Sequence, residues 1–517
     1  MTAPLHTAAF ISANLYKDSV ALMRVAQGLL ALPGVVNATL QMGNPANKDI
    51  LREAGLLHQA VQDAGPSDVM VVVQARSAAE CAAAVASCQA QLAGTQASGA
   101  GTAEAQALPR TNLAMGQAGL TGANLAQISV PGAYAAAEAL KAVKLGMNVF
   151  LFSDNVPLEQ EAALKQEATR RGLLVMGPDC GTAIIGGVPL GFANAVRRGN
   201  IGLVAASGTG LQEVSTQIHR MGGGVSHAIG TGGRDVYAEV GGATMLQGIS
   251  LLAADPGTKV IAVVSKPPAP AVAQRVLDAL RASGKPSVVI FIGSETTAPH
   301  RGNAASPRIA HTLVDCAAMA VRLAGVKRQA PAHYPLPRKP VFAKSQKYLR
   351  ALYAGGTFTA EAQSLWAGAG LKVWSNVPLE PALELSHPRQ SSREHTALDL
   401  GDDAFTVGRP HPMIDQAARI ERLLIEAADP SVRVILLDVV IGWGAHSNPA
   451  AELATAITQA KVLAAKRGRQ LAIVGFVCGT EADPQVLSQQ EALLRKAGMV
   501  LAGNSANAAW LAGQWLR

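Results

Sequence analysis

Two stretches of nine residues, 174 positions apart, are nearly identical in this chain. Residues 253–261 read AADPGTKVI, residues 427–435 read AADPSVRVI, and six of the nine positions agree. A helical pattern precedes each stretch and a strand pattern follows it. Each repeated unit also opens with a strand and a Gly-Thr turn, at Gly208-Thr209 and at Gly356-Thr357. The shared order favours duplication over a chance match, so we expect two similar domains that pack together, with paired helix N-termini facing a common site.

Short apolar strands alternate with amphipathic helices between residues 126 and 292, a pattern typical of parallel sheets with crossover helices. The pattern predicts strands at 148–152, 173–176, 201–205, 259–265 and 287–292 and helices at 133–145, 158–171, 211–221 and 271–282. The first 95 residues predict a small α/β unit of ferredoxin-like type. Residues 93–107 are small and polar, and residues 329–348 are rich in proline, so both are expected to be linkers.

Composition excludes several classes of protein. Apolar residues make up 49% and charged residues 15% of the 517 positions, as in ordinary globular chains. No apolar stretch reaches 18 residues and the N-terminus lacks a signal-peptide pattern, so we expect a cytoplasmic protein without a membrane partner. The net charge of +8 is modest, which argues against nucleic acid and suits small anionic substrates. The five cysteines have no zinc-binding spacing, so no metal site is expected.

The turn Ser207-Gly208-Thr209-Gly210 follows a predicted strand and begins a predicted helix. Its backbone N–H groups, its hydroxyls and the helix dipole predict a phosphate-binding turn, and a plain tight turn is the alternative. Gly356-Thr357 lies at the corresponding place of the repeat. Neither turn is a Walker loop. Glu213 follows in the first turns of the helix, where composition alone predicts a solvent-facing acid. A second glycine-rich loop, Gly230–Asp235, either closes over a ligand or simply turns.

Two prolines flank His411 in the sequence Gly408-Arg409-Pro410-His411-Pro412 and hold the backbone extended. The Arg409 guanidinium offers a planar fork for a carboxylate or a phosphate, and His411 can donate to a developing anion or move a proton. These features favour a ligand role over a structural turn. Thr480 lies in another loop at a strand end, the usual ligand position of α/β folds. The preceding Cys478 is expected to be a packed strand residue.

The sequence resembles the FdrA family, relatives of succinyl-CoA synthetase, across nearly its whole length. The stretches that carry this resemblance are Tyr16–Met23, Met42–Lys48, Ile128–Gly132, Leu151–Asn155, Gly177–Gly181, Asp399–Asp403, Gly408–Asp415 and Leu436–Gly442. The resemblance implies an α/β protein with a CoA-binding-type Rossmann domain, two flavodoxin-like ligase domains and a small N-terminal α/β domain. The implied boundaries are 1–95, 126–198 for the CoA-binding-like domain, 199–326 for the synthetase α-like ligase domain, and 346–517 for the synthetase β-like ligase domain.

The resemblance also implies a function, as a subunit of oxamate carbamoyltransferase in allantoin breakdown, which converts carbamoyl phosphate and oxamate to oxalurate and phosphate. Arg409, His411 and Glu213 would be catalytic, and phosphate and substrate would bind at Ser207, Gly208, Thr209, Gly210, Gly356, Thr357 and Thr480. No cofactor would be required. The expected partners are other subunits of a hetero-oligomer.

Two other functions stay open. The first is an acyl-CoA synthetase subunit that works with a separate nucleotide-binding chain and binds CoA at the Gly132 turn. The second is a non-catalytic scaffold or regulatory subunit. The sequence departs from the synthetase pattern where a phosphohistidine loop is expected, because residues 293–307 read GSETTAPHRGNAASP and the context of His300 does not match. A nucleotide-binding ATP-grasp pattern is also missing between the two ligase-like domains.

Overall fold

The structure is a computed structural model that describes residues 5–15, 17, 19–97, 110–294, 306–327, 333–335, 338–389, 391–406 and 409–516. His300, most of the expected linker at 93–107 and part of the one at 329–348 lie outside these ranges. The chain divides into two compact units. The first comprises Met1–Thr111 with Val407–Pro410, and the second comprises Asn112–Thr406 with His411–Arg517.

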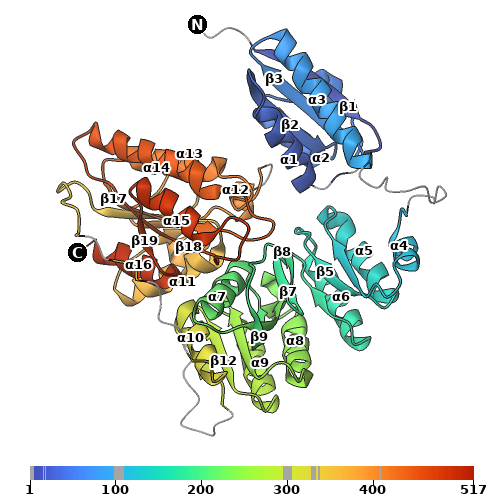
Figure 1. Cartoon of the computed structure of the whole chain (residues 1–517), viewed down its shortest axis with the longest axis vertical. Helices are drawn as coiled ribbons and strands as arrows, with labels where there is room; N and C mark the ends of the chain where they lie inside the picture. Colours follow the sequence, from blue (N-terminus) through green and yellow to red (C-terminus); the bar gives the residue numbers. More distant parts are fainter. Residues whose placement is uncertain are drawn as a thin grey trace. The chain divides into compact units, whose positions relative to one another are not determined.

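The first unit is an antiparallel three-stranded sheet with helices on both faces, drawn in blue in Figure 1. Its strands lie in the order β1 (His6–Ser12), β3 (Val69–Ala75) and β2 (Val35–Met42), and its helices are α1 (Ser19–Leu30), α2 (Pro45–Glu53), η1 (Gln59–Val61) and α3 (Ala78–Ala97). The central strand β3 alternates its buried side chains between the two faces, so Val71 packs with α1 and α3 and Val72 packs with α2. This is the small α/β domain that the sequence predicts.

The second unit begins with a small parallel sheet. After α4 (Leu113–Gly119), its strands lie in the order β4 (Leu125–Ile128), β5 (Asn148–Leu151) and β6 (Val175–Met176), joined by α5 (Gly132–Lys144) and α6 (Leu158–Arg170). The hairpin β7 (Thr182–Ile185) and β8 (Val188–Gly191) pairs with β10 of the next sheet. These strands therefore belong to the following sheet, although the predicted boundary at 198 placed them in the Rossmann domain.

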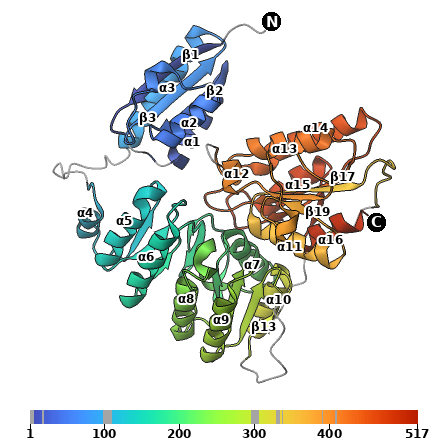
Figure 2. The ribbon, with the colours of Figure 1, turned by 180° about the vertical axis from the view of Figure 1, so that it is seen from behind.

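The next sheet has seven strands in the order β13-β12-β11-β9-β10-β7-β8. Its remaining elements are β9 (Arg198–Ala205), α7 (Gly208–Arg220), β10 (Val225–Gly230), η2 (Gly233–Val236), α8 (Ala243–Ala254), β11 (Val260–Ser265), α9 (Pro270–Ala282), β12 (Ser287–Phe291), β13 (Arg308–Ile309) and α10 (Leu313–Leu323). Helices α8 and α9 pack on one face, and α7 and α10 pack on the other (Figures 1 and 2).

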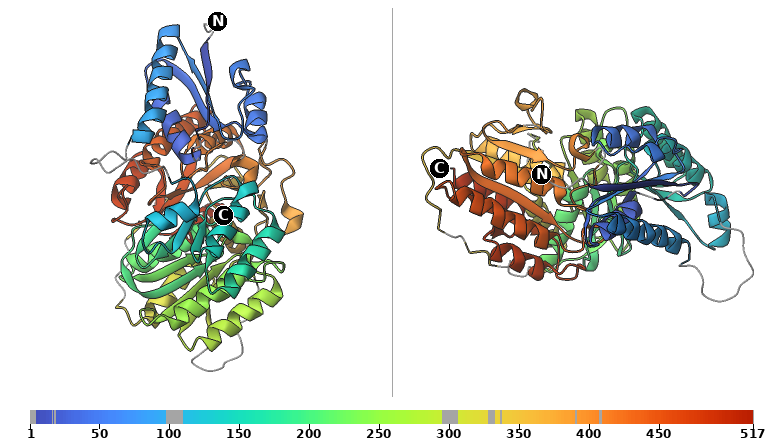
Figure 3. Two further views of the ribbon diagram at one scale, coloured as in Figure 1. Left: turned by 90° about the vertical axis from the view of Figure 1, so that its right-hand side faces the viewer. Right: turned by 90° about the horizontal axis from the view of Figure 1, so that it is seen from above.

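The last sheet has six strands in the order β15-β16-β14-β17-β18-β19. Its elements are β14 (Tyr348–Tyr353), α11 (Gly356–Gly368), β15 (Trp374–Ser375), η3 (Pro381–Leu383), β16 (Thr396–Asp399), α12 (Asp403–Thr406), α13 (Ala417–Ala428), β17 (Val432–Val440), α14 (Pro449–Ala465), β18 (Ala472–Cys478), α15 (Leu487–Lys496), β19 (Val500–Ala502) and α16 (Ser505–Gln514). Helices α13, α14 and α15 pack on one face, and α11 and α16 pack on the other. Figure 3 shows this sheet, in orange and red, with helices on both faces.

The predicted duplication is confirmed by the topology of these two sheets. The two similar nine-residue stretches connect α8 to β11 in one sheet and α13 to β17 in the other. The strand order β13-β12-β11-β9-β10 in the first corresponds to β19-β18-β17-β14-β16 in the second. The inner helices α7, α10, α11 and α16 contribute to one shared hydrophobic core, so the two domains pack face to face and α7 lies against α11.

Candidate functional site

The N-termini of α7 and α11 meet. The Ser207 and Thr357 hydroxyls are hydrogen-bonded to each other, and a Cβ added at Gly355 would lie 2.7 Å from Thr209 Oγ1. Both helices follow the central strand of their sheet, β9 or β14, so their N-termini lie at the carboxyl edges of the strands. The predicted pairing of the two helix N-termini is confirmed, and their role as a common site stays a prediction.

The polar groups at this junction are only partly satisfied. Ser207 Oγ accepts the Gly210 N–H at 2.9 Å and caps α7, whereas no side chain caps α11 at Gly355. Thr209 is 6% exposed, and within the described part of the chain its hydroxyl has no hydrogen-bond partner. Uncapped amides, a free hydroxyl and two positive helix ends suit an anion such as phosphate.

A small pocket adjoins α7 at the same edge of the seven-stranded sheet. Its lining comes from three loops and consists mostly of backbone: Asp179, Cys180, Gly181, Thr182, Ala205, Ser207, Gly208, Gly230, Gly232 and Gly233. A Cβ at Gly232 would clash with the Pro178 carbonyl, and one at Gly230 would lie 2.6 Å from Cys180 Sγ. The second glycine-rich loop therefore packs directly on residues 178–182 and forms a wall of the pocket, which supports the ligand-closing interpretation of that loop.

Among the residues that the structure describes, Asp179 is the one acid that lines this pocket. Its backbone has φ 53°, a conformation that costs energy for a non-glycine residue and that clusters at functional sites. The side chain is exposed by surface area, yet protein surrounds it on most sides. This desolvation, followed by repulsion from Asp154 and Asp403, raises the pKa of Asp179 to about 7 against the opposing charges of Arg234 and Lys266.

Lys266 and Asp399 lie beside the N-terminus of α11. A Cβ added at Gly356 would lie 2.6 Å from Asp399 Oδ2 and 2.7 Å from Lys266 Nζ. Burial raises the pKa of Asp399 to about 6, although Lys266 and the Gly401 N–H lower it. The Lys266 ammonium is exposed and lies at the positive end of α11, so the helix dipole does not stabilise its charge. The ammonium and the helix end together attract an anion. No motif recognised in the sequence includes Lys266, so it was not among the predicted site residues.

His411 lies next to this cluster. A Cβ added at Gly401 would be 2.5 Å from His411 Nε2 and 3.2 Å from Asp399 Oδ1, and the imidazole lies 5.9 Å from the Phe192 ring, centroid to centroid. His411 Nδ1 accepts the Met413 N–H at 3.2 Å, so the neutral ring carries its proton on Nε2. Burial, together with a smaller contribution from the charge of Arg419, lowers the pKa of His411 to about 4. His411 is thus a neutral hydrogen-bond donor.

Arg409 is exposed and belongs to the first unit, whereas His411 belongs to the second. Gly408 lies outside the described residues. The predicted cooperation of Arg409 with His411 therefore stays a prediction.

Glu213 differs from the solvent-facing acid that composition predicts, because it is completely buried. Its Oε1 accepts the Ser505 N–H at 3.3 Å and the Gln217 side-chain amide at 3.2 Å, so it satisfies the first amide of α16. Glu361 of α11 does the same for α10 by accepting the Leu313 N–H at 2.7 Å, and Ser505 Oγ donates to Glu361. This placement favours a structural role for Glu213, and its predicted catalytic role is not tested.

The last two predicted positions are also engaged in packing. Thr480 Oγ1 donates to the Ala195 carbonyl at 2.8 Å, and Asp483 accepts the Thr480 N–H at 2.7 Å and the Ala195 N–H at 2.6 Å. At Gly132 a Cβ would lie 2.6 Å from the Asn155 carbonyl, so the chain after β5 occupies the space over this turn. Substrate binding at Thr480 and CoA binding at Gly132 stay predictions.

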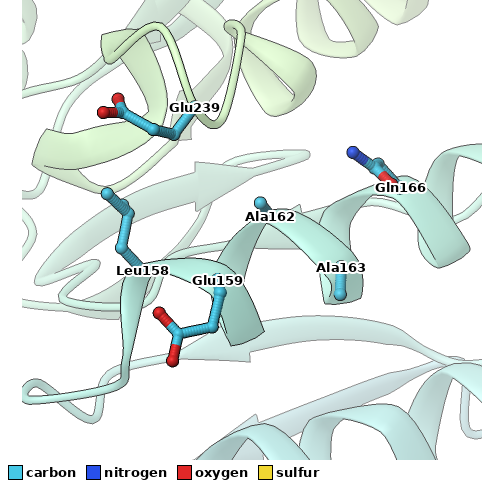
Figure 4. A pocket seen from close by; sticks show the side chains of 6 residues that line it. All are labelled: Leu158, Glu159, Ala162, Ala163, Gln166 and Glu239. Atoms are coloured by element: carbon cyan, nitrogen blue, oxygen red, sulfur yellow. The ribbon is translucent and has the colours of Figure 1, made fainter.

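A larger hollow of about 390 Å³ lies elsewhere, at the start of α6. Figure 4 shows its lining, with the Glu159 and Glu239 carboxylates around Leu158 and with Ala162, Ala163 and Gln166 along the helix. Two acids and no cation line it, so it does not suit an anionic substrate. Among the described residues, no group of three or more His, Cys, Asp or Glu side chains is placed to hold a metal ion.

Family models match three parts of the chain. The CoA-ligase model matches residues 352–515, the CoA binding domain model matches 196–293, and the AllF heavy metal-associated domain model matches 5–108. The chain is also 43% identical to YahF of Escherichia coli (strain K12) over 514 residues, with 98% of each chain covered. The chain belongs to the family of YahF. With its CoA-binding and CoA-ligase domains, this family is succinyl-CoA synthetase-like.

More distant relatives agree with this assignment. The chain is 28% identical over 172 residues to the succinate–CoA ligase subunit alpha of Aquifex aeolicus, covering 32% of this chain and 54% of that one. It is 26% identical over 183 residues to the sulfoacetate-CoA ligase subunit SauD of Bilophila wadsworthia, covering 34% and 60%. The chain thus spans about half the length of these ligase subunits. A solved acetyl-coenzyme A synthetase of Ca. Korarchaeum cryptofilum matches at 16% identity with a TM-score of 0.32, covering 76% of this chain and 82% of that one.

The family models and the ligase subunits make the chain an acyl-CoA synthetase-like protein, and the family models confirm the predicted α/β fold. The CoA-binding match falls on 196–293, the segment in which we expected the α-like ligase domain, and the predicted domain boundaries stay predictions. Among the described helices, none is long and apolar enough to span a membrane. The FdrA assignment and the cytoplasmic location also stay predictions.

Proposed function

We propose that this chain is the acyl-transfer subunit of an acyl-CoA synthetase of the succinyl-CoA ligase type. The observation that carries this proposal is the meeting of α7 and α11, where Ser207 and Thr357 are bonded to each other and α11 has no side-chain cap. A phosphate group at this place gains from two positive helix ends, from free amides and from the nearby Lys266 ammonium.

The reaction proposed is transfer of an acyl group from an acyl phosphate to the thiol of CoA, with phosphate as the other product. Phosphate stays at the helix N-termini, and His411 donates its Nε2–H toward the carbonyl oxygen on which negative charge develops. CoA is a substrate in this scheme. A partner chain supplies the nucleotide-dependent step that forms the acyl phosphate, as in the synthetase-like alternative derived from the sequence.

Carbamoyl transfer from carbamoyl phosphate to oxamate is the second candidate. The same junction supports it, because carbamoyl phosphate offers the same phosphate and a similar carbonyl group. This reaction starts from an activated substrate and needs no nucleotide. The names of the relatives favour the acyl-CoA reaction, which is therefore the first proposal.

Two assays with the full-length chain, alone and with co-purified partners, test the proposal. The first follows thioester formation from succinyl phosphate or acetyl phosphate and CoA, and the second follows phosphate release from carbamoyl phosphate with oxamate. We expect thioester formation without added nucleotide. Phosphate release in the second assay alone would favour carbamoyl transfer.

Thr357→Val keeps the shape of the side chain and removes its hydroxyl. Hydrogen bonds to charged groups contribute about 1.5–3 kcal/mol, so we expect phosphate to bind roughly 10- to 150-fold more weakly in calorimetry. Thr458→Val, on the outer helix α14 with its hydroxyl bonded only to Ala454 O, is the matched control and should bind as wild type. Absence of phosphate binding by the wild-type chain, together with inactivity in both assays, would refute the proposal.

A further inference from the structure

We propose that Asp179 is the general base of this site and takes the proton from the thiol that attacks the acyl phosphate. This inference rests on the proposed function, and it assigns a role to a side chain that was not among the site residues predicted from the sequence. Asp179 lines the same small pocket as Ser207 and Gly208 at the N-terminus of α7, where the phosphate end of the substrate would be held.

The surroundings of Asp179 fit a proton acceptor better than a structural carboxylate. Its backbone N–H donates to the Ser153 carbonyl at 2.9 Å and so holds the loop in place. Within the described residues, the carboxylate itself makes no hydrogen bond and no salt bridge. This contrasts with the buried acids Glu161 and Asp235, which are both paired with Lys165 at 2.9 and 2.8 Å.

The pocket also contains groups that would hold a reactant beside Asp179. The backbone of Gly230, Gly232 and Gly233 forms one wall, and the start of α7 forms another. Outside this pocket, Thr209 lies at the meeting of the two helices, where a Cβ added at Gly355 would be 2.7 Å from its Oγ1.

Charged groups around Asp179 come from four elements. Asp154 follows β5 and Asp403 begins α12, and both repel the carboxylate. Arg234 of η2 and Lys266 after β11 attract it. Because desolvation and the two acids outweigh the two cations, the pKa of Asp179 is raised to about 7, which suits a base that works near neutral pH.

The chemical step is balanced. The thiol sulfur forms a bond to the acyl carbonyl carbon, and the bond from that carbon to the phosphate oxygen breaks. The electron pair of the broken bond leaves with phosphate, which remains at α7 and α11. The thiol proton passes to the Asp179 carboxylate and then to water. The acyl phosphate and the thiol are the only reactants.

The test is the pH dependence of kcat/KM for thioester formation from an acyl phosphate and CoA, measured with the full chain and its partners. In the wild type we expect the rate to rise with pH through an apparent pKa near 7. Asp179→Asn should lose about 10²- to 10⁴-fold in kcat and this acidic limb, while binding inorganic phosphate as before.

Asp154→Asn is the matched control, because Asp154 is exposed, repels Asp179 and does not line the pocket. It should keep the maximal rate and move the acidic limb to lower pH. An Asp179→Asn variant that keeps at least a third of the rate and the same acidic limb would overturn this inference alone. An inactive wild-type chain in this assay would overturn it together with the proposed function. A loss of phosphate binding in Asp179→Asn would mark Asp179 as structural and would also overturn it.

Discussion

Lys165 of α6 is the centre of a buried ion cluster whose removal should open the wall of the pocket. Its ammonium is 2.9 Å from Glu161 Oε1, 2.8 Å from Asp235 Oδ1 and 2.9 Å from the Thr231 carbonyl. The lysine side chain is 1% exposed, and both acids are completely buried. Lys165→Met keeps most of the volume of the side chain but leaves two buried carboxylates with one fewer cation.

The expected loss of stability in Lys165→Met depends on the hydrogen bonds and ion pairs that Glu161 and Asp235 keep. Arg234 still pairs with Glu161 at 2.9 Å, and the Thr244 and Met245 N–H groups still donate to Asp235. Removing one partner of a buried ion pair costs about 3–5 kcal/mol. Because both acids keep some partners, we expect Lys165→Met to lose about 3 kcal/mol of local stability, the lower end of that range.

Hydrogen–deuterium exchange is the suitable assay, because the chain has several domains and a single unfolding free energy is poorly defined for it. A loss of about 3 kcal/mol corresponds to roughly 150-fold faster exchange through local opening of α6 and residues 231–235. The matched control is Lys141→Met on α5, whose ammonium lies 2.6 Å from Glu138 with the two side chains 63% and 34% exposed. Such an exposed pair contributes about 0.3–0.5 kcal/mol, or roughly a 2-fold change. Equal effects of the two variants would refute the reasoning.

Three more predictions concern titration and binding. Burial raises the pKa of Glu361 to about 7 from 4.5, so the folded state binds a proton that the unfolded state releases. The stability of α11 against local opening, measured as hydrogen-exchange protection factors, should therefore fall from pH 4.5 to 7, and Glu361→Gln should flatten this slope. An unchanged slope would contradict this. Because burial lowers the pKa of His411 to about 4, nitrogen NMR should find it as the neutral Nε2–H form at pH 6, and an imidazolium signal there would argue against it. Arg409→Lys in the assembled complex should lose about 10- to 150-fold in kcat/KM with an unchanged circular dichroism spectrum, and wild-type kinetics would count against an anion-binding role.

Local turn chemistry was the part of the site that the sequence could predict. The turn at Ser207–Gly210 and its counterpart at Gly356-Thr357 follow from residue types at strand ends. The repeat around residues 253 and 427 placed the two turns in similar domains. The structure adds that the two turns are in direct contact. Glu213 shows the limit of such reasoning, because its burial depends on α16, almost 300 residues later in the chain.

Asp179, Lys266 and Asp399 illustrate why the other charged residues of the candidate site were not predicted from the sequence. Asp179 follows β6, Lys266 follows β11 and Asp399 ends β16, so three distant segments contribute one charged group each and no spacing in the sequence connects them. One physical rule does connect them, since ligands of parallel α/β sheets bind at the carboxyl ends of the strands. Applied to charged residues within three positions of a predicted strand end, this rule selects Asp179 after the strand at 173–176 and Lys266 after the strand at 259–265. No strand was predicted at Thr396–Asp399, so Asp399 would still have been missed. The pKa of Asp399 depends on its burial and on the charge of Lys266, which comes from the other duplicated domain. These two residues reach the same helix N-terminus only when the two domains pack together.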